Sequence, residues 1–163
     1  MVEHTMREVT DADAQAIVDV FNYHARNSFA AYADHEVGTE LFHRLRNASR
    51  KFLFLVVEVE HQVVGFGLMC PYHTFDTFKK TAVLTYFLLP DYTRLGLGSE
   101  LLNRLVRDAR ARGVDNLLAH ISSRNKQSLD FHRKHGFVEC GRLRGIGVKF
   151  GEKFDVVWMQ KSL

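Results

Sequence analysis

Cysteine and proline are scarce in this chain, with two of each among 163 residues. Cys70 and Cys140 stand far apart, and neither belongs to a paired spacing of the kind that binds zinc. The cysteine content therefore does not indicate a disulfide framework, and we expect two reduced structural thiols. We also expect no metal ion in the functional site.

Long apolar runs are missing too, since none approaches the roughly 20 residues that a membrane-spanning helix needs. Residues 1–4 lack the basic and then apolar pattern of a secretory signal. We therefore expect a cytoplasmic protein that does not enter a membrane. Low-complexity segments, internal repeats and linkers rich in Gly or Pro are absent, which predicts one domain over residues 1–163.

A strong excess of one charge is also absent, because the formal net charge is +3 and the pI is about 9.0. A mildly basic chain suits an anionic cofactor, and it also suits nucleic acid. Four arginines fall on the outer side of one expected helix: Arg104, Arg107, Arg110 and Arg112. No aromatic residues alternate with them to stack on bases, so we interpret them as a solvated face and expect no nucleic-acid partner.

One stretch, residues 84–99, organises the rest of the chain. A short apolar run ends at Leu89, and Pro90 cannot continue a strand ladder. Apolar residues after Gly98 recur at helical spacing, so the stretch predicts a strand, a turn and a helix. Gly96 and Gly98 allow close approach of the backbone to a ligand, and the helix N-terminus attracts anions such as phosphate. A tight turn without a ligand is the alternative.

Two well-known phosphate motifs are excluded at this turn. No Gly-Lys-Ser/Thr follows, so the stretch is not a Walker loop. The dinucleotide-binding fingerprint needs a third small residue, and Leu101 stands in its place.

The remaining pattern predicts a mixed fold. We expect strands over residues 2–9, 52–59, 63–69, 82–89, 116–121, 137–143 and 154–159, and helices after Thr10 and over residues 39–49, 97–112 and 125–135. Thr10 and Asp13 have the spacing of a helix-capping pair. Residues 27–38 predict a loop over a pocket, and Gly145, Gly147 and Gly151 predict a turn region between the last two strands.

Four motifs identify a resemblance. The Gly-turn of residues 93–98 and the later Asn125-x-x-Ser128-x-x-Phe131-His132-x-x-x-Gly136-Phe137 resemble the GNAT acyl-CoA N-acetyltransferases. The C-terminal Gly145-x-Gly147-x-Lys149-Phe150-Gly151-x-x-x-Asp155-x-x-x-Met159-Gln160 is similar to the phosphinothricin acetyltransferase branch. The early Ile17-Val18-x-Val20-Phe21-Asn22 is similar to the same branch, so the resemblance covers nearly the whole chain.

The resemblance implies an α/β fold of the α+β type. Its sheet would have seven mostly antiparallel strands and about four flanking helices, and it would splay between residues 82–89 and residues 116–121. Acetyl-CoA, as a cosubstrate, would lie in that opening. It implies contacts to acetyl-CoA from Phe87, Leu88, Leu89, Thr93, Arg94, Leu95, Gly96, Leu97, Gly98, Ser99, Asn125, Ser128 and His132. Asn125 also fits a helix N-cap.

The same resemblance implies that His132 protonates the departing CoA thiolate, which a histidine near neutral pKa can do. A surface histidine on a helix is the alternative. The branch carries a Glu as general base on its central strand, and Val83 stands at that position here. His120 is our substitute candidate, followed by His73 and Asp76 acting through water. A structural or solvent-facing role for His120 is the alternative.

Two further departures concern ligands. The Gly-turn of the family opens with Arg or Gln, whereas this chain has Thr93 followed by Arg94, which predicts weaker CoA binding. Lys153 replaces the aromatic residue of the C-terminal motif, so phosphinothricin itself is not the expected acceptor. Acceptor contacts, with core packing as the alternative for the aromatic residues, are expected from Phe29, Tyr32, Phe75, Phe78, Val83 and Thr85.

The expected function is acetyl transfer from acetyl-CoA to the primary amine of a small molecule, such as an amino acid or an analogue. Acetylation of a peptide or protein amine is the alternative among enzymes. Because Val83 replaces the Glu of the branch, a non-catalytic acyl-CoA sensor is a further alternative. The branch also suggests a homodimer formed through the C-terminal hairpin.

Overall fold

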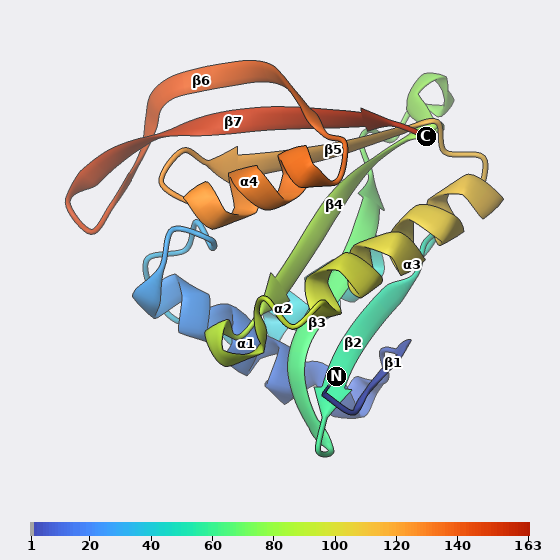
Figure 1. The fold of residues 1–163 in the computed structure, drawn as a ribbon, viewed down its shortest axis with the longest axis vertical. Helices are drawn as coiled ribbons and strands as arrows, with labels where there is room; N and C mark the ends of the chain where they lie inside the picture. The colour runs from blue at the N-terminus through green and yellow to red at the C-terminus, as the bar shows by residue number, and fades with distance from the viewer. Residues whose placement is uncertain (1) are drawn as a thin grey trace.

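Seven strands form one sheet in the order β1-β2-β3-β4-β5-β7-β6 in this computed structural model, which describes residues 2–163. The strands are β1 (His4–Glu8), β2 (Phe54–Val59), β3 (Gln62–Pro71), β4 (Thr81–Leu88), β5 (Asn116–Ser122), β6 (Val138–Lys149) and β7 (Glu152–Ser162). The helices are α1 (Ala14–Asn27), α2 (Glu40–Ala48), α3 (Leu97–Ala111) and α4 (Lys126–Lys134). The predicted element order and the mostly antiparallel sheet are confirmed (Figure 1).

The predicted turn region before the last strand is wrong at two glycines. Gly145 and Gly147 lie inside β6, which runs to Lys149 with irregular pairing between Leu143 and Gly147. A Cβ at position 147 would stand 2.1 Å from the Phe154 ring, so the chain needs glycine there to pack against β7. Only Gly151, with φ +74°, serves the turn itself.

The sheet splays between β4 and β5, as the resemblance implied. These two strands run parallel and pair only over residues 81–83 and 116–118. Figure 1 shows them meeting near the C-terminus and separating toward the other end of β4. Beyond Val83 the edge of β4 that faces β5 therefore has no strand partner, which opens the sheet to a ligand.

The two faces of the sheet carry separate apolar cores. One core packs α3 and α4 against Leu84, Leu117 and Ala119, whereas the other packs α1 and α2 against Phe66 and Leu68. Side chains alternate between faces along each strand, and directly paired residues share a face. Tyr86 therefore lies on the face of α3 and α4, and Thr85 lies on the face of α1 and α2.

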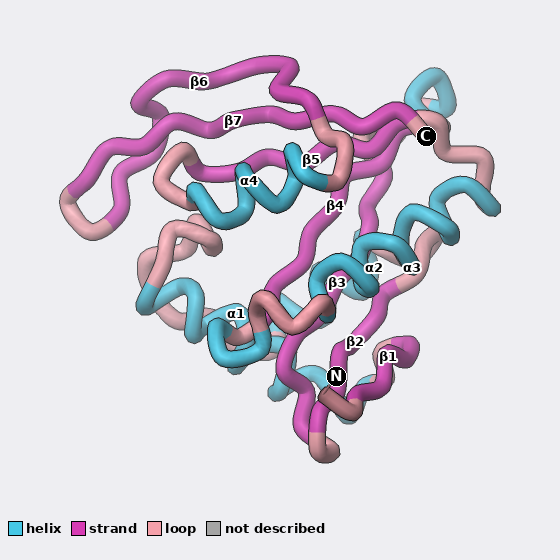
Figure 2. The backbone as a smooth tube through the Cα atoms, viewed as in Figure 1, coloured by secondary structure: helices cyan, strands magenta, loops and turns pink. Residues whose placement is uncertain are grey.

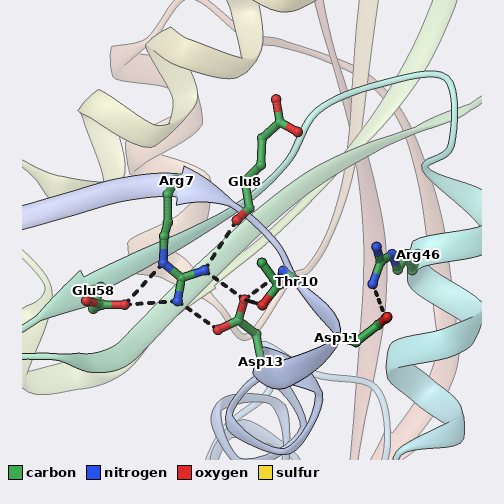
Figure 3. A network of polar contacts seen from close by, with 7 residues as sticks. All are labelled: Arg7, Glu8, Thr10, Asp11, Asp13, Arg46 and Glu58. Atoms are coloured by element: carbon green, nitrogen blue, oxygen red, sulfur yellow. Dashed lines mark hydrogen bonds and ion pairs between the residues drawn. The ribbon is translucent and has the colours of Figure 1, made fainter.

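An ion-pair network fastens β1 to the start of α1 (Figure 3). Arg7 donates to both oxygens of Asp13 at 2.8 Å and to Glu58 at 2.9 Å. Asp13 also accepts from the Thr10 N–H at 2.8 Å, so the capping pair predicted from the sequence is confirmed. The Arg7 guanidinium lowers the pKa of Asp13 to about 2.

Within residues 2–163, no helix is long and apolar enough to cross a membrane. That part of the chain also has no cluster of three or more His, Cys, Asp or Glu side chains arranged to hold a metal ion. Both cysteines are free thiols, as predicted.

Candidate active site

A cavity of about 370 Å³ occupies the splay between β4 and β5. Its wall joins parts of the chain that are distant in sequence. These are residues 84–87 of β4, residues 119–122 of β5, residues 30–33 with Val37 of the loop after α1, Asn125, Ser128 and His132 at α4, Phe21 of α1 and Arg44 of α2. The predicted loop over a pocket is confirmed. Because the cavity crosses the opened sheet, it reaches side chains of both faces.

His132 is held on both ring nitrogens. Its Nδ1 lies 2.7 Å from the Ser128 carbonyl oxygen, which can only accept, so Nδ1 carries the proton. Its Nε2 is therefore the acceptor of the Tyr86 hydroxyl, with which it is hydrogen bonded. The Tyr86 and His132 rings also stack, with centroids 5.5 Å apart and planes 20° apart.

Burial fixes the charge of this pair. The His132 side chain is 3% exposed, which excludes the alternative of a surface histidine. Burial lowers the pKa of His132 to about 4 and raises the pKa of Tyr86 well above 10. At pH 7 both groups are therefore neutral, and His132 has a lone pair at Nε2 that faces Tyr86.

A second tyrosine–histidine pair lies on the face of α1 and α2. The Tyr32 hydroxyl is 3.1 Å from His120 Nδ1, and the two rings stack with centroids 5.6 Å apart and planes 22° apart. Tyr32 stacks on Phe154 on its other side, and His120 contacts Trp158. Packing in this aromatic wall lowers the pKa of His120 and raises the pKa of Tyr32 to about 12.

The loop that carries Tyr32 is fastened by a buried lysine. Lys149 Nζ donates to the carbonyl oxygens of Ser28 and Ala31 at 2.6 and 2.7 Å, and to His24 at 3.3 Å. This side chain is 2% exposed, and burial lowers its pKa. Figure 2 shows the loop, in pink, between α1 and the β6–β7 hairpin. Lys149 thereby positions the Tyr32 wall from the end of β6.

The Gly-turn leads into α3 with the backbone geometry of an anion site. Arg94 has φ +62° and Gly96 has φ +87°, and Gly96 is the N-cap. The first helical bond is donated by the Glu100 N–H to the Gly96 carbonyl, which leaves the N–H groups of Leu97, Gly98 and Ser99 for a ligand. A Cβ at Gly96 would meet no atom within 4 Å, so space is open beside the turn.

Two of the residues at the end of β4 that are predicted to contact acetyl-CoA already use a backbone group in a hydrogen bond. The Leu89 N–H bonds to the Val64 carbonyl at 2.9 Å, and the Leu88 carbonyl lies 2.8 Å from His24 Nε2. His24 thus fixes the end of β4 from α1. Asn125 accepts from the Ser128 N–H at 3.2 Å, which confirms the N-cap reading, and its side chain also lines the cavity.

Several predicted acceptor residues do not line this cavity. Tyr32 and Thr85 do, whereas Phe29 packs behind the wall against Phe150 and Phe154. Phe75 and Phe78 lie in an exposed aromatic cluster with Tyr72 and His73. Val83 pairs with Cys70 and Leu118 in the closed part of the sheet.

Sequence reasoning missed Tyr86, Arg44 and the anchoring roles of His24 and Lys149. Tyr86 stood inside an apolar strand, where an aromatic residue signals only strand propensity. Arg44 comes from α2, and nothing in its local pattern distinguishes it from a solvated charge. Lys149 belonged to the C-terminal motif, but its partners lie more than 110 residues away.

Comparison with known proteins gives close relatives along the full chain. The L-methionine sulfoximine/L-methionine sulfone acetyltransferase of Salmonella typhimurium is 31% identical over 98% of this chain and 94% of its own. The phosphinothricin N-acetyltransferase of Streptomyces viridochromogenes is 29% identical over 96% of this chain and 86% of its own. The similarity to the phosphinothricin branch is thus confirmed.

A solved structure agrees with the fold and with the cosubstrate. The putative acetyltransferase yncA of Salmonella typhimurium, in complex with acetyl-CoA, superposes with a TM-score of 0.89. It is 30% identical, and the match covers 98% of this chain and 94% of that one. Residues 17–137 also match the family model described as the acetyltransferase (GNAT) family. The chain therefore belongs to the GNAT acetyltransferase family, and it is an acetyl-CoA-dependent acyltransferase.

Proposed function

We propose that this protein transfers the acetyl group of acetyl-CoA to the primary amine of an amino acid or an amino-acid analogue. The observation that carries the proposal is the cavity through the splay, which opens to α4 on one face and to the Tyr32 loop on the other. Relatives named for methionine sulfone, methionine sulfoximine and phosphinothricin support this substrate class.

Charge in the cavity supports an acceptor that carries an anionic group besides its amine. Among the described residues of the wall there is no Asp or Glu, and Arg44 is the one Lys or Arg. A carboxylate or sulfoximine oxygen gains from a nearby guanidinium, whereas a dicationic amine meets only repulsion. The apolar part of the wall, which includes Phe21, Ala31 and Val37, suits an uncharged side chain.

The proposed contacts divide between the cosubstrate and the acceptor. Acetyl-CoA contacts are assigned to Phe87, Leu88, Leu89, Thr93, Arg94, Leu95, Gly96, Leu97, Gly98, Ser99, Asn125, Ser128 and His132. Acceptor contacts are assigned to Tyr32, Thr85 and His120, with Phe29 supporting the wall. Phe75, Phe78 and Val83 lie outside this wall and are left out of the assignment.

We also propose that residues 1–163 act as one catalytic domain of a cytoplasmic homodimer, without nucleic-acid or membrane partners. The edge strand β6 supports the dimer, because it exposes Val138, Leu143, Ile146 and Val148, and Phe150 is exposed in the turn that follows it. Light scattering of the purified protein measures the oligomeric state, and a monomer mass at micromolar concentration contradicts the dimer.

An amine panel tests the function by measuring CoA release from acetyl-CoA. The panel contains L-methionine sulfone, L-methionine sulfoximine, phosphinothricin, apolar L-amino acids and short peptides. Each amino acid is paired with its decarboxylated amine as a matched control for the anionic group. We expect the highest kcat/KM among the free amino acids or analogues. Equal rates for the decarboxylated amines would remove the role of Arg44, and activity on peptides alone would contradict the substrate class.

A further inference from the structure

Both ring nitrogens of His132 are engaged in hydrogen bonds within the protein. Its Nδ1 is bonded to the Ser128 carbonyl, its Nε2 is bonded to the Tyr86 hydroxyl, and its side chain is 3% exposed. Tyr86 is the one of these partners whose hydroxyl can carry a proton to Nε2, and it also lines the cavity. Any proton that moves between a bound molecule and Nε2 must therefore pass through the Tyr86 oxygen.

The reaction needs such a route because the wall has no carboxylate base. No Asp or Glu is found among the described residues that line the cavity, and Val83 does not line it. The ring nitrogens of His132 and His120 are the remaining neutral bases in the wall. Of these, only His132 has a second hydrogen bond, to Ser128, that holds its other nitrogen protonated.

We propose that Tyr86 is a catalytic residue that relays one proton from the attacking nitrogen to His132 Nε2 and then returns it to the leaving sulfur. The inference rests on the proposed acetyl transfer and adds a residue to it. Both reacting atoms are bonded to the same carbon of the tetrahedral intermediate. One hydroxyl that contacts this carbon's substituents can therefore serve both in succession.

The protons and electron pairs balance in this scheme. The acceptor amine, having released one proton to solvent, attacks the thioester carbonyl carbon, and the C–N bond forms as the carbonyl pair moves to oxygen. The positively charged nitrogen gives a proton to the Tyr86 oxygen while the Tyr86 proton moves to His132 Nε2. The carbonyl re-forms, the C–S bond breaks, and its electron pair leaves with sulfur. The imidazolium then returns the proton through Tyr86 to the thiolate.

The resting hydrogen bonds set the direction of this relay. Because the Ser128 carbonyl keeps the proton on Nδ1, the pair begins with an unprotonated Nε2 that accepts the Tyr86 hydrogen bond, and it must accept a proton before it donates one. Burial favours the second step of this order, since it lowers the pKa of His132 to about 4 and makes the imidazolium a strong acid toward a thiolate.

Tyr86→Phe is the decisive variant, because it removes the hydroxyl and keeps the ring that stacks on His132. We expect kcat to fall by about 10²-fold, within the range of general acid–base catalysis, with acetyl-CoA affinity unchanged. Tyr32→Phe removes the matched hydroxyl from the other pair. We expect it to raise the acceptor KM by less than about tenfold, since it alters packing rather than proton transfer.

The pH profile separates a relay from a structural role. As pH rises, solvent base takes the nitrogen proton, so the deficit of Tyr86→Phe should shrink by tenfold or more between pH 7 and pH 9.5. A structural defect gives a deficit that is constant with pH. A variant with kcat within twofold of the parent, or with a pH-independent deficit, would overturn the relay.

Failure of the proposed function is recognised separately, in the parent protein. If the parent releases no CoA with any amine of the panel, the acetyl transfer fails and the catalytic role of Tyr86 fails with it. Nitrogen-15 NMR of the parent histidines tests the hydrogen bonds without activity. We expect His132 protonated on Nδ1 and untitrated down to about pH 5, and an Nε2-protonated ring would overturn the relay.

Discussion

The two tyrosine–histidine pairs have nearly the same ring geometry but lie in opposite environments. Centroid distances are 5.5 and 5.6 Å, and interplanar angles are 20° and 22°. His132 is 3% exposed and is bonded on both nitrogens, whereas the Tyr32 side of the cavity is open, with that tyrosine 42% exposed. The pairs also lie on different faces of the splayed sheet.

This difference shows that contact geometry alone does not assign a proton-transfer role. A histidine relays protons in one direction when a second partner fixes its tautomer and when burial keeps water away from it. Ser128 and α4 provide both conditions for His132. The described hydrogen bonds of His120 include only the Tyr32 hydroxyl, so its ring can adopt either tautomer.

The largest expected effect falls on the buried Tyr86–His132 pair. Replacing His132 by Ala should lower kcat by about 10²- to 10⁴-fold, because the proton acceptor is lost while the turn before α3 is intact. Steady-state kinetics and calorimetry with acetyl-CoA measure the two properties separately. A His132→Ala variant that keeps full turnover would show that neither pair takes part in proton transfer.

Acid stability gives a second test of the buried Tyr86–His132 pair. Because burial depresses the pKa of His132 to about 4, the folded state resists its protonation, whereas the unfolded chain binds that proton near pH 6.5. Stability is therefore complete above pH 6.5 and falls by up to about 3 kcal/mol as pH is lowered to 4. Urea unfolding should show a shallower acid dependence in His132→Gln, and parallel curves would contradict the prediction.

A change in the Gly-turn should affect acetyl-CoA binding at α3 and not acceptor binding on the other face. Gly96 has φ +87°, which a β-branched residue cannot adopt without strain, so Gly96→Val should weaken acetyl-CoA binding at least tenfold. Gly113→Val is the matched control, because Gly113 has φ +74° at the other end of α3 and open space around it.

Both glycine variants should lose thermal stability, but only Gly96→Val should lose acetyl-CoA affinity. Calorimetry measures the acetyl-CoA affinity of both variants. Equal affinities in the two variants would remove the turn from the cosubstrate site.

The smallest effect is expected at the exposed Tyr32–His120 pair. His120→Ala should lower kcat/KM by less than about tenfold, since the ring packs in the acceptor wall but has no fixed tautomer. If His120 is instead the substitute base, its loss should be largest near pH 7 and should fade at high pH. A pH–rate profile of the variant distinguishes these outcomes, and a loss equal to that of His132→Ala would reverse the comparison.

Local signals were enough for the elements near the cosubstrate turn. Pro90, Gly96 and the helical spacing after Gly98 are neighbours in sequence, and their conformational preferences are intrinsic to the residues. The prediction that Gly145 and Gly147 lie in a turn was wrong for the opposite reason. Gly147 packs against Phe154, and Gly145 has φ +62° within an irregular part of the ladder, and local composition encodes neither feature.

The sequence by itself determined the order of elements, the Gly-turn before α3 and the family, because these depend on short-range patterns. Only the tertiary structure decided which histidine is buried, which tyrosine contacts it and which residues line the cavity. Tyr86 and His132 are 46 residues apart, and Tyr32 and His120 are 88 apart. Their meeting depends on the parallel pairing of β4 with β5 and on its end at Val83, where the sheet opens and brings the two faces to one cavity.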